Sequence, residues 1–175
     1  MEKFISSERI YDGKIINVRK DRVEIDNDKY SYREIVEHNG GSSIALKNDE
    51  GKFYLVKQYR YGQKDFTLEF VAGKLEKGED PTEAIERETV EESGYSVKNL
   101  KYFGYMMPTP AYAEEKIYLY YGETDKYIGQ NFDDDEDLEL LSFSIEELSE
   151  MVKTNIIKDA KTIALIYYIK LYDLD

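Results

Sequence analysis

Three glutamates in the middle of the chain, Glu88, Glu91 and Glu92, are the residues whose types and spacing could perform chemistry. In a helix, offsets of three and four residues place these carboxylates on one face. Like charges at that spacing repel each other unless a cation lies between them. Mg²⁺ and Mn²⁺ bind carboxylate oxygens and share them with phosphate groups, so the cluster predicts a divalent-metal site.

An arginine accompanies this acidic cluster. Arg87 lies four residues before Glu91 and eight residues after Glu79. A guanidinium at these offsets can contact a carboxylate on each side, so we expect Arg87 to orient acidic groups and not to bind the metal. The alternative is a solvated helix face, which is the usual role of a run of charges in an acidic protein.

The element that must carry the glutamates is a helix with clear boundaries. Asp80 can serve as the N-cap, Pro81 suits the first helical position and Glu83 completes a capping-box pattern. Gly94 supplies a C-terminal stop. These signals predict a helix from Pro81 to Ser93.

The rest of the chain predicts strands on both sides of this helix and two more helices at the end. Alternating or β-branched segments separated by turn clusters predict strands over Lys14–Ile25, Tyr30–His38, Ser42–Lys47, Phe53–Tyr61, Leu68–Val71, Val97–Met106, Lys116–Glu123 and Leu138–Phe143. One later helix is capped by Ser144, and another runs from Asp159 through Leu171. This order favours an α+β fold with a mixed sandwich.

Composition excludes several classes of function. The 24 Lys and Arg residues face 37 Asp and Glu residues, which gives a net charge of −13 without a basic cluster. We therefore expect no nucleic-acid partner and no membrane partner, and an anionic ligand would need a mediating cation. The absence of cysteine and the single histidine exclude thiolate chemistry and make His-based sites improbable. With no signal-peptide core and no long apolar stretch, the chain is expected to be cytoplasmic.

The spacing of the central segment resembles a known signature. Gly73, five residues, Glu79, seven residues and then Arg87-Glu88-Thr89-Val90-Glu91-Glu92-Ser93-Gly94-Tyr95 is similar to the Nudix box, the signature of hydrolases that act on nucleoside diphosphates linked to another group. Thr89 stands where that family usually has an aliphatic residue. We expect Thr89 to cost some packing and to leave the metal chemistry untouched.

The resemblance extends along most of the chain and narrows the family to its ADP-ribose pyrophosphatase branch. The segments that carry it are Glu37–Gly40, Leu55–Arg60, Leu68–Glu76 and Asp159–Thr162. It implies a Nudix-like α/β/α sandwich with a mixed β-sheet, preceded by N-terminal antiparallel β-hairpin strands. Residues 1–38 would then form a dimerisation region and residues 39–175 the hydrolase domain, with a homodimer as the assembly.

The same resemblance implies the residues of a site and a reaction, the hydrolysis of ADP-ribose to AMP and ribose 5-phosphate. Mg²⁺, with Mn²⁺ as a possible substitute, would be held by Glu88, Glu92 and the backbone carbonyl of Ala72. Glu91 and Arg87 would assist. Glu136, with Asp134 as the second choice, would supply a base or a final metal ligand. The expected substrate-binding residues are Arg60, Glu69, Pro110 and Glu115.

Departures from the family pattern leave the exact substrate open. Ala111 and Val71 replace a glycine and a proline that are usual in that branch. Another nucleoside diphosphate derivative, such as a nucleotide sugar or NADH, is the first alternative. A non-catalytic ADP-ribose sensor and an acidic cation-buffering module are the others. Hydrolysis would exclude the sensor, and Mg²⁺ binding that tightens with nucleotide would exclude the buffer.

Overall fold

The computed structural model describes residues 1–26, 28–131 and 138–175. The chain folds into two units. One contains residues Met1–Gly40 together with Met107–Lys116, and the other contains Gly41–Met106 together with Ile117–Asp175. Both residues chosen as the base, Glu136 and Asp134, lie outside the described residues.

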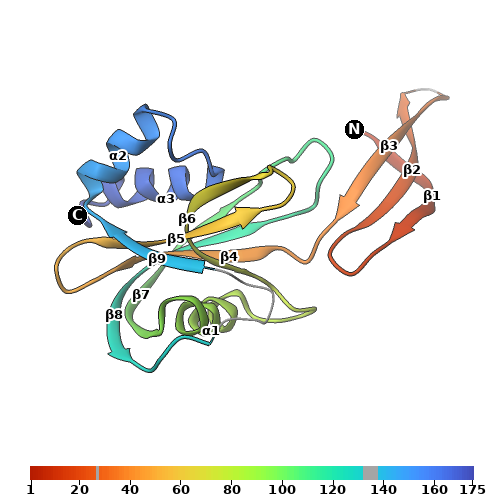
Figure 1. The fold of residues 1–175 in the computed structure, drawn as a ribbon. Helices are drawn as coiled ribbons and strands as arrows, with labels where there is room; N and C mark the ends of the chain where they lie inside the picture. The colour runs from red at the N-terminus through yellow and green to blue at the C-terminus, as the bar shows by residue number, and fades with distance from the viewer. Residues whose placement is uncertain (27, 132–137) are drawn as a thin grey trace. The chain divides into compact units, whose positions relative to one another are not determined.

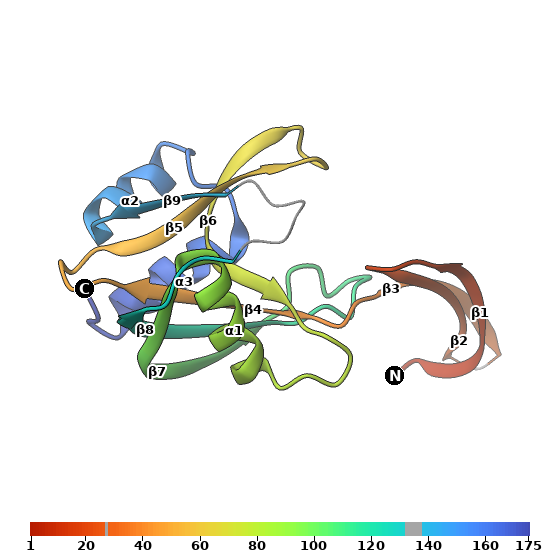
Figure 2. The same ribbon diagram turned by 60° about the horizontal axis from the view of Figure 1, so that its bottom comes forward.

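The larger unit is a sheet covered by helices on both faces (Figure 1). Its described strands are β4 (Gly41–Lys47), β5 (Phe53–Arg60), β6 (Asp65–Lys74), β7 (Tyr95–Met106), β8 (Ile117–Tyr127) and β9 (Leu138–Phe143), in the order β7-β8-β4-β6-β5-β9. The sheet is mixed because β4 and β8 are parallel, whereas β4 and β6 are antiparallel. Helix α1 (Pro81–Ser93) lies on one face, and α2 (Ile145–Lys153) and α3 (Ala160–Leu171) lie on the other (Figure 2). The predicted α+β sandwich is therefore confirmed.

Alternation along the strands sends apolar side chains to both faces of this sheet. On β5, Leu55 belongs to a buried cluster with Leu148 of α2 and Leu165 of α3. Its neighbour Val56 belongs to a second buried cluster, which includes Ile85 of α1. The α1 helix is thus fixed against β4 and β6 by apolar packing, and its charged residues are left to other directions.

One strand differs from the prediction in a way that bears on the site. The sequence predicts only a short strand over Leu68–Val71, followed by a loop, but β6 continues to Lys74. It continues because Gly41 to Ile44 of β4 pairs with Lys74 to Val71 in an antiparallel register. Gly73 therefore lies within a strand. The sequence did not predict this because glycine has a low strand propensity.

The smaller unit is an antiparallel sheet of β1 (Lys3–Asp12), β2 (Asn17–Asp26) and β3 (Lys29–Glu37). The sequence did not predict β1 as a separate strand, because all of its residues are exposed and it shows no burial alternation. Residues 107–116 join this unit by pairing with β3. The Val36 amide donates to the Tyr112 carbonyl over 2.7 Å, and the Glu114 amide donates to the Val36 carbonyl over 3.0 Å.

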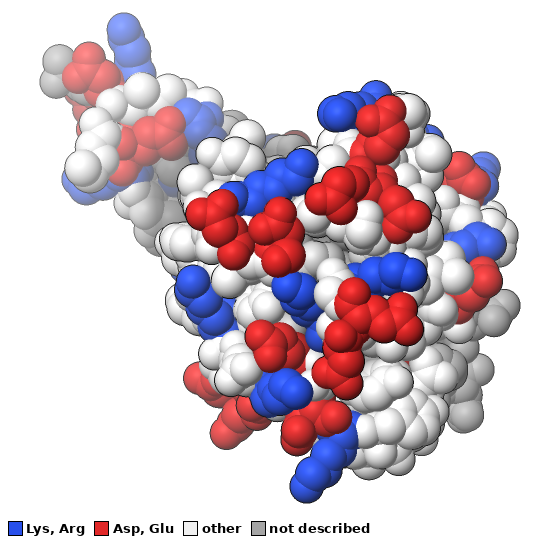
Figure 3. Space-filling view, turned by 90° about the vertical axis from the view of Figure 1, so that its left-hand side faces the viewer, with Lys and Arg blue, Asp and Glu red and all other residues white. Residues whose placement is uncertain are grey.

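Basic and acidic side chains are mixed on the one face of the surface that Figure 3 draws. On the face drawn in Figure 3, Lys and Arg side chains are separated by Asp and Glu side chains and form no continuous basic patch. In the described part of the chain, no helix has the length and apolar character needed to cross a membrane. The absence of a nucleic-acid partner stays a prediction.

Candidate active site

Helix α1 is bounded by Asp80 and Gly94, as the sequence predicted, but its N-cap hydrogen bond comes from the Thr82 amide, whereas the predicted capping box would use Glu83. Asp80 adopts an extended conformation and its Oδ1 accepts a hydrogen bond from the Thr82 amide over 2.8 Å. Pro81 begins the helix, and Gly94 ends it in the left-handed region with a φ of 79°. The predicted boundaries, Pro81 to Ser93, are confirmed. These ends set the rotation with which α1 presents its glutamates.

The glutamates of α1 reach the backbone of β6 at Ala72 and Gly73. The Ala72 amide donates to Glu92 Oε2 over 3.3 Å, and Glu92 is only 4% exposed. A Cβ atom on Gly73 would lie 1.8 Å from the carboxyl carbon of Glu88. A side chain at position 73 would displace Glu88, so glycine lets the Glu88 carboxylate lie against the strand.

Arg87 joins three carboxylates of this region. Its Nη1 donates to Glu88 Oε1 over 2.8 Å and to Glu91 Oε2 over 2.9 Å, and its Nη2 donates to Glu79 Oε1 over 3.2 Å. Partial burial alone would lower the pKa of Arg87, but these ion pairs raise it. The contacts to Glu79 and Glu91 agree with the spacing in the sequence, and the contact to Glu88 is additional.

The donor atoms in this region suit a hard divalent cation. Among the described residues, no three acidic or histidine side chains are gathered into a ready metal site. Arg87 Nη1 instead lies between oxygens of Glu88 and Glu91. Carboxylate oxygens are ligands that Mg²⁺ and Mn²⁺ prefer, and the glycine at position 73 leaves room for the Glu88 side chain against the strand. The residues present therefore fit such an ion.

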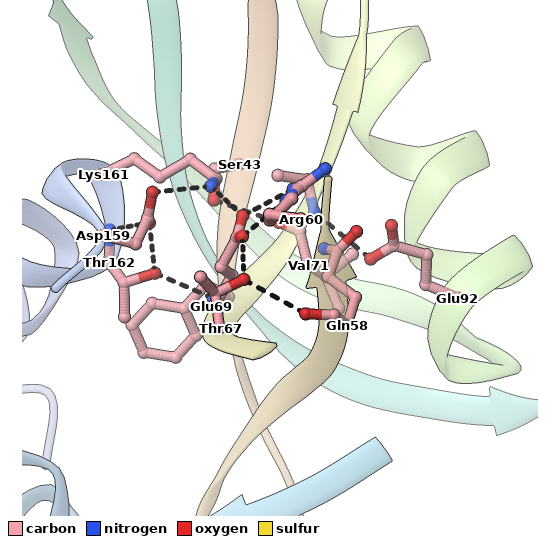
Figure 4. A network of polar contacts seen from close by, with 12 residues as sticks. Ser43, Gln58, Arg60, Thr67, Glu69, Val71, Glu92, Asp159, Lys161 and Thr162 are labelled. Atoms are coloured by element: carbon pink, nitrogen blue, oxygen red, sulfur yellow. Dashed lines mark hydrogen bonds and ion pairs between the residues drawn. The ribbon is translucent and has the colours of Figure 1, made fainter. Parts of the chain in front are cut away.

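A second polar cluster surrounds Glu69 of β6 (Figure 4). Arg60 of β5 binds this carboxylate with two parallel hydrogen bonds, from Nε to Oε1 over 2.7 Å and from Nη2 to Oε2 over 2.6 Å. Thr67 Oγ1 also donates to Oε1 over 2.6 Å, and Lys161 of α3 forms an ion pair with Oε2. The predicted substrate-binding residues Arg60 and Glu69 are thus in direct contact.

The electrostatics of Glu69 follow from burial and from these partners. Glu69 is only 3% exposed, and burial alone would raise its pKa. The hydrogen bonds and charges of Arg60 and Lys161 outweigh burial and lower the pKa to about 2. Because these donors fill both oxygens, Glu69 holds Arg60 in place and has little capacity left for a ligand.

The Glu69 cluster borders a pocket of about 760 Å³. The pocket lies between the β5–β6 hairpin and the start of α3, and it is lined by Arg60, Tyr61, Gly62, Gln63, Asp65, Phe66, Thr67, Leu68, Glu69, Ile156, Lys158, Asp159, Ala160 and Lys161. Sequence reasoning identified Asp159 as a helix start and missed the role of Lys161. The only available signal was the Asp159–Thr162 segment of the family resemblance.

The other two predicted substrate-binding residues, Pro110 and Glu115, belong to the smaller unit. Glu115 lies 3.4 Å from Nδ1 of His38. The preceding Glu114 is paired with Arg19 of β2 over 2.5 Å. The segment that carries Pro110 is thus anchored to the N-terminal strands by backbone pairing and by ion pairs.

Thr89, the departure from the family pattern, is fully buried on α1. Its hydroxyl donates to the Ile85 carbonyl one turn earlier over 2.6 Å. The polar group is therefore satisfied within the helix.

Comparison with known proteins places this geometry in a family. A model of the NUDIX domain matches residues 37–166. The chain is 36% identical over 172 residues to the ADP-ribose pyrophosphatase of Bacillus subtilis (strain 168), which covers 97% of this chain and 93% of that protein. It is 34% identical to the methanol dehydrogenase activator of Bacillus methanolicus, with coverages of 98% and 94%.

A solved structure shows the same fold. The crystal structure of an ADP compounds hydrolase superimposes with a TM-score of 0.85, covers 98% of this chain and 93% of its own, and is 16% identical in sequence. The NUDIX match includes helix α1 with its glutamates, strand β6 with Gly73, and Arg60. The chain therefore belongs to the NUDIX family of hydrolases.

Proposed function

We propose that this protein hydrolyses the pyrophosphate bond of ADP-ribose to AMP and ribose 5-phosphate with the help of Mg²⁺ or Mn²⁺. The observation that carries the proposal is the placement of Glu88 and Glu92 of α1 against Ala72 and Gly73 of β6. The similarity over nearly the full length to an ADP-ribose pyrophosphatase supports the choice of substrate. In the reaction, water adds to one phosphorus and the bridging P–O bond breaks.

The α1 residues would hold the divalent ion. Glu88, Glu92 and the Ala72 carbonyl are the proposed ligands, and the bound ion would neutralise phosphate charge and lower the pKa of an attacking water. Arg87 would keep the Glu88 and Glu91 carboxylates oriented through its hydrogen bonds of 2.8 and 2.9 Å. The local cation would explain how a chain of net charge −13 accepts an anionic substrate.

Two further sets of residues complete the proposal. Arg60 would bind a phosphate or the terminal ribose, with Glu69 fixing its guanidinium. Pro110 and Glu115 would contribute to substrate binding from the smaller unit. Glu136, or Asp134 as the second choice, would supply the base or a last metal ligand.

We also propose a cytoplasmic homodimer. The strands of the smaller unit expose large apolar side chains, and Phe4, Ile10 and Tyr11 of β1 are each more than half exposed. A second copy of the chain is the partner expected to cover them. Sedimentation equilibrium at micromolar concentration tests this, and a 20.5 kDa monomer would contradict it.

The activity is tested by incubating the protein with Mg²⁺ and a panel of ADP-ribose, nucleotide sugars and NADH, with products separated by chromatography. We expect AMP and ribose 5-phosphate from ADP-ribose, and no product in excess EDTA. Turnover that survives EDTA, or a panel without product, would refute the proposal. If another derivative is turned over faster than ADP-ribose, that derivative is the preferred substrate of the same reaction.

A second candidate function comes from the other close relative. The name of the Bacillus methanolicus protein describes it as an activator of methanol dehydrogenase, and its similarity to this chain is almost the same. Activation of a partner enzyme is therefore the alternative. The hydrolysis assay excludes a non-catalytic ADP-ribose sensor, which would leave the nucleotide intact, whereas activation is tested by adding the protein to a methanol dehydrogenase.

A further inference from the structure

Lys161, at the beginning of α3, is a cation placed almost entirely inside the protein. Its side chain is 11% exposed. Its Nζ forms an ion pair with Glu69 Oε2 and lies 3.0 Å from Asp159 Oδ1. Burial of a charge is expensive, so the position of Lys161 requires a reason beyond packing.

Neutralisation of Glu69 does not supply that reason. Arg60 already forms a bidentate pair with this carboxylate, so one cation balances it before Lys161 is counted. The helix start does not supply it either, because the N-cap is made by Asp159, whose Oδ2 accepts from the Thr162 amide over 2.9 Å. Besides its ion pair with Asp159, Lys161 adds a second, independent contact to the Oε2 atom that Arg60 binds.

The orientation of Arg60 matters because two carboxylates compete for it. Its guanidinium lies between Glu69 and Glu92 of α1 (Figure 4). The hydrogen bonds to Glu69 are the main cause of its raised pKa, and the charge of Glu92 contributes more weakly. If the Glu69 carboxylate rotated, Arg60 could turn toward Glu92, and both the arginine and a proposed metal ligand would be lost to the substrate.

We infer that Lys161 is a positioning residue, which locks the Glu69 carboxylate so that Arg60 stays turned toward the substrate and away from Glu92. The inference rests on the proposed function, in which Arg60 binds the phosphate or terminal ribose of a nucleoside diphosphate derivative. It assigns to α3, on the opposite face of the sheet from α1, a part in substrate binding.

The test compares Lys161→Met with Lys153→Met. Lys153 of α2 pairs with Glu150 and its side chain is 72% exposed, so both variants remove one positive charge but only one removes a contact with Glu69. We expect Lys161→Met to raise the KM for ADP-ribose about tenfold with kcat nearly unchanged, because Arg60 would bind ground state and transition state alike. Lys153→Met should leave both constants within about twofold. Equal effects of the two variants would overturn the inference.

A double-mutant cycle shows whether Lys161 acts through Arg60. In an Arg60→Met background, Lys161→Met should raise KM no further, because the group that it positions is absent. A second tenfold loss in that background would mean that Lys161 acts independently. Urea unfolding of each variant shows which variants fold. If Lys161→Met does not fold, Lys161→Gln, which keeps a hydrogen-bond donor for Glu69, takes its place in the comparison.

A readout without turnover separates this inference from the proposed function. The Arg60 Nε–H group, bonded to Glu69 at 2.7 Å, can be followed by nitrogen-15 NMR and assigned with Arg60→Lys. Its hydrogen exchange should be about tenfold faster in Lys161→Met and unchanged in Lys153→Met. An unchanged exchange rate in Lys161→Met would refute the positioning role. A wild-type protein that cleaves no substrate would refute only the function.

Discussion

Substitution of Glu69 by Gln removes the buried charge on which Arg60 and Lys161 converge, and its cost can be worked from the pKa. The carboxyl has an ordinary pKa of 4.5; burial alone would raise it, but its partners lower it to about 2. The difference is about 2.5 pH units, and at about 1.4 kcal/mol per unit the ionised group contributes about 3 kcal/mol to folding. At pH 7 we expect Glu69→Gln to lower the free energy of unfolding by about that amount.

The stabilising effect of the Glu69 charge depends on pH in a definite direction. Because the pKa of Glu69 is lower in the folded protein, its contribution is complete above the unfolded pKa of 4.5 and is lost as the pH falls toward about 2. Gln cannot titrate. The stability difference between wild type and variant should therefore be constant above about pH 6 and shrink by about 2 kcal/mol by pH 3.

Urea unfolding of both proteins at pH 7, 5 and 3 measures this difference. Glu139→Gln is the matched control, because Glu139 pairs with Lys57 over 3.2 Å and its side chain is 60% exposed. The control should change stability by less than about 0.5 kcal/mol at each pH. A difference for Glu69→Gln below about 1 kcal/mol at pH 7, or one that does not shrink in acid, would refute the reasoning.

Three other changes test α1 and its contact with β6. Glu92→Gln should lower kcat by several orders of magnitude, because it removes a charged ligand at nearly constant volume; a loss of tenfold or less would refute the metal role. Gly73→Ala should displace Glu88, with activity falling about 100-fold and stability by about 1 kcal/mol or less; full activity in the same assay would contradict the close approach. Thr89→Val, measured by thermal unfolding, should stabilise the protein by about 1 kcal/mol, because a methyl group replaces a buried hydroxyl whose bond to Ile85 is local, and a lower Tm would argue otherwise.

The sequence predicted the fold best where the signals are local. The caps at Asp80 and Gly94 determine α1 through bonds within a few residues, and the observed helix has the predicted ends. The capping box of Ser144 and Glu147 on α2 is likewise present. Strand β1 was not predicted because its exposed residues show no alternation. The end of β6 was not predicted because it depends on pairing with Gly41 of β4.

In the candidate site, too, the contacts between residues close in sequence could be predicted and the long-range contacts could not. Arg87 and its contacts follow from offsets of four and eight residues around one helix, so spacing alone indicates them. The ion pair of Lys161 with Glu69 joins residues 92 positions apart. No periodicity connects such residues, and only the packing of α3 beside β6 brings them together. Neither local pattern nor charge count could have shown that Glu69 is held by residues of two other elements, β5 and α3.

The glutamates of this region differ in what they can still bind, and that difference separates their roles. Glu69 accepts from Arg60, Thr67 and Lys161, so its oxygens are committed to side chains and its charge is balanced within the protein. Glu92 accepts a hydrogen bond from the Ala72 amide over 3.3 Å, and its charge contributes to the raised pKa of Arg60. A divalent ion would gain from Glu92 and little from Glu69. Because the oxygens of Glu69 are committed to side chains, we propose that a divalent ion binds at α1 and that Glu69 of β6 serves to hold Arg60 of β5.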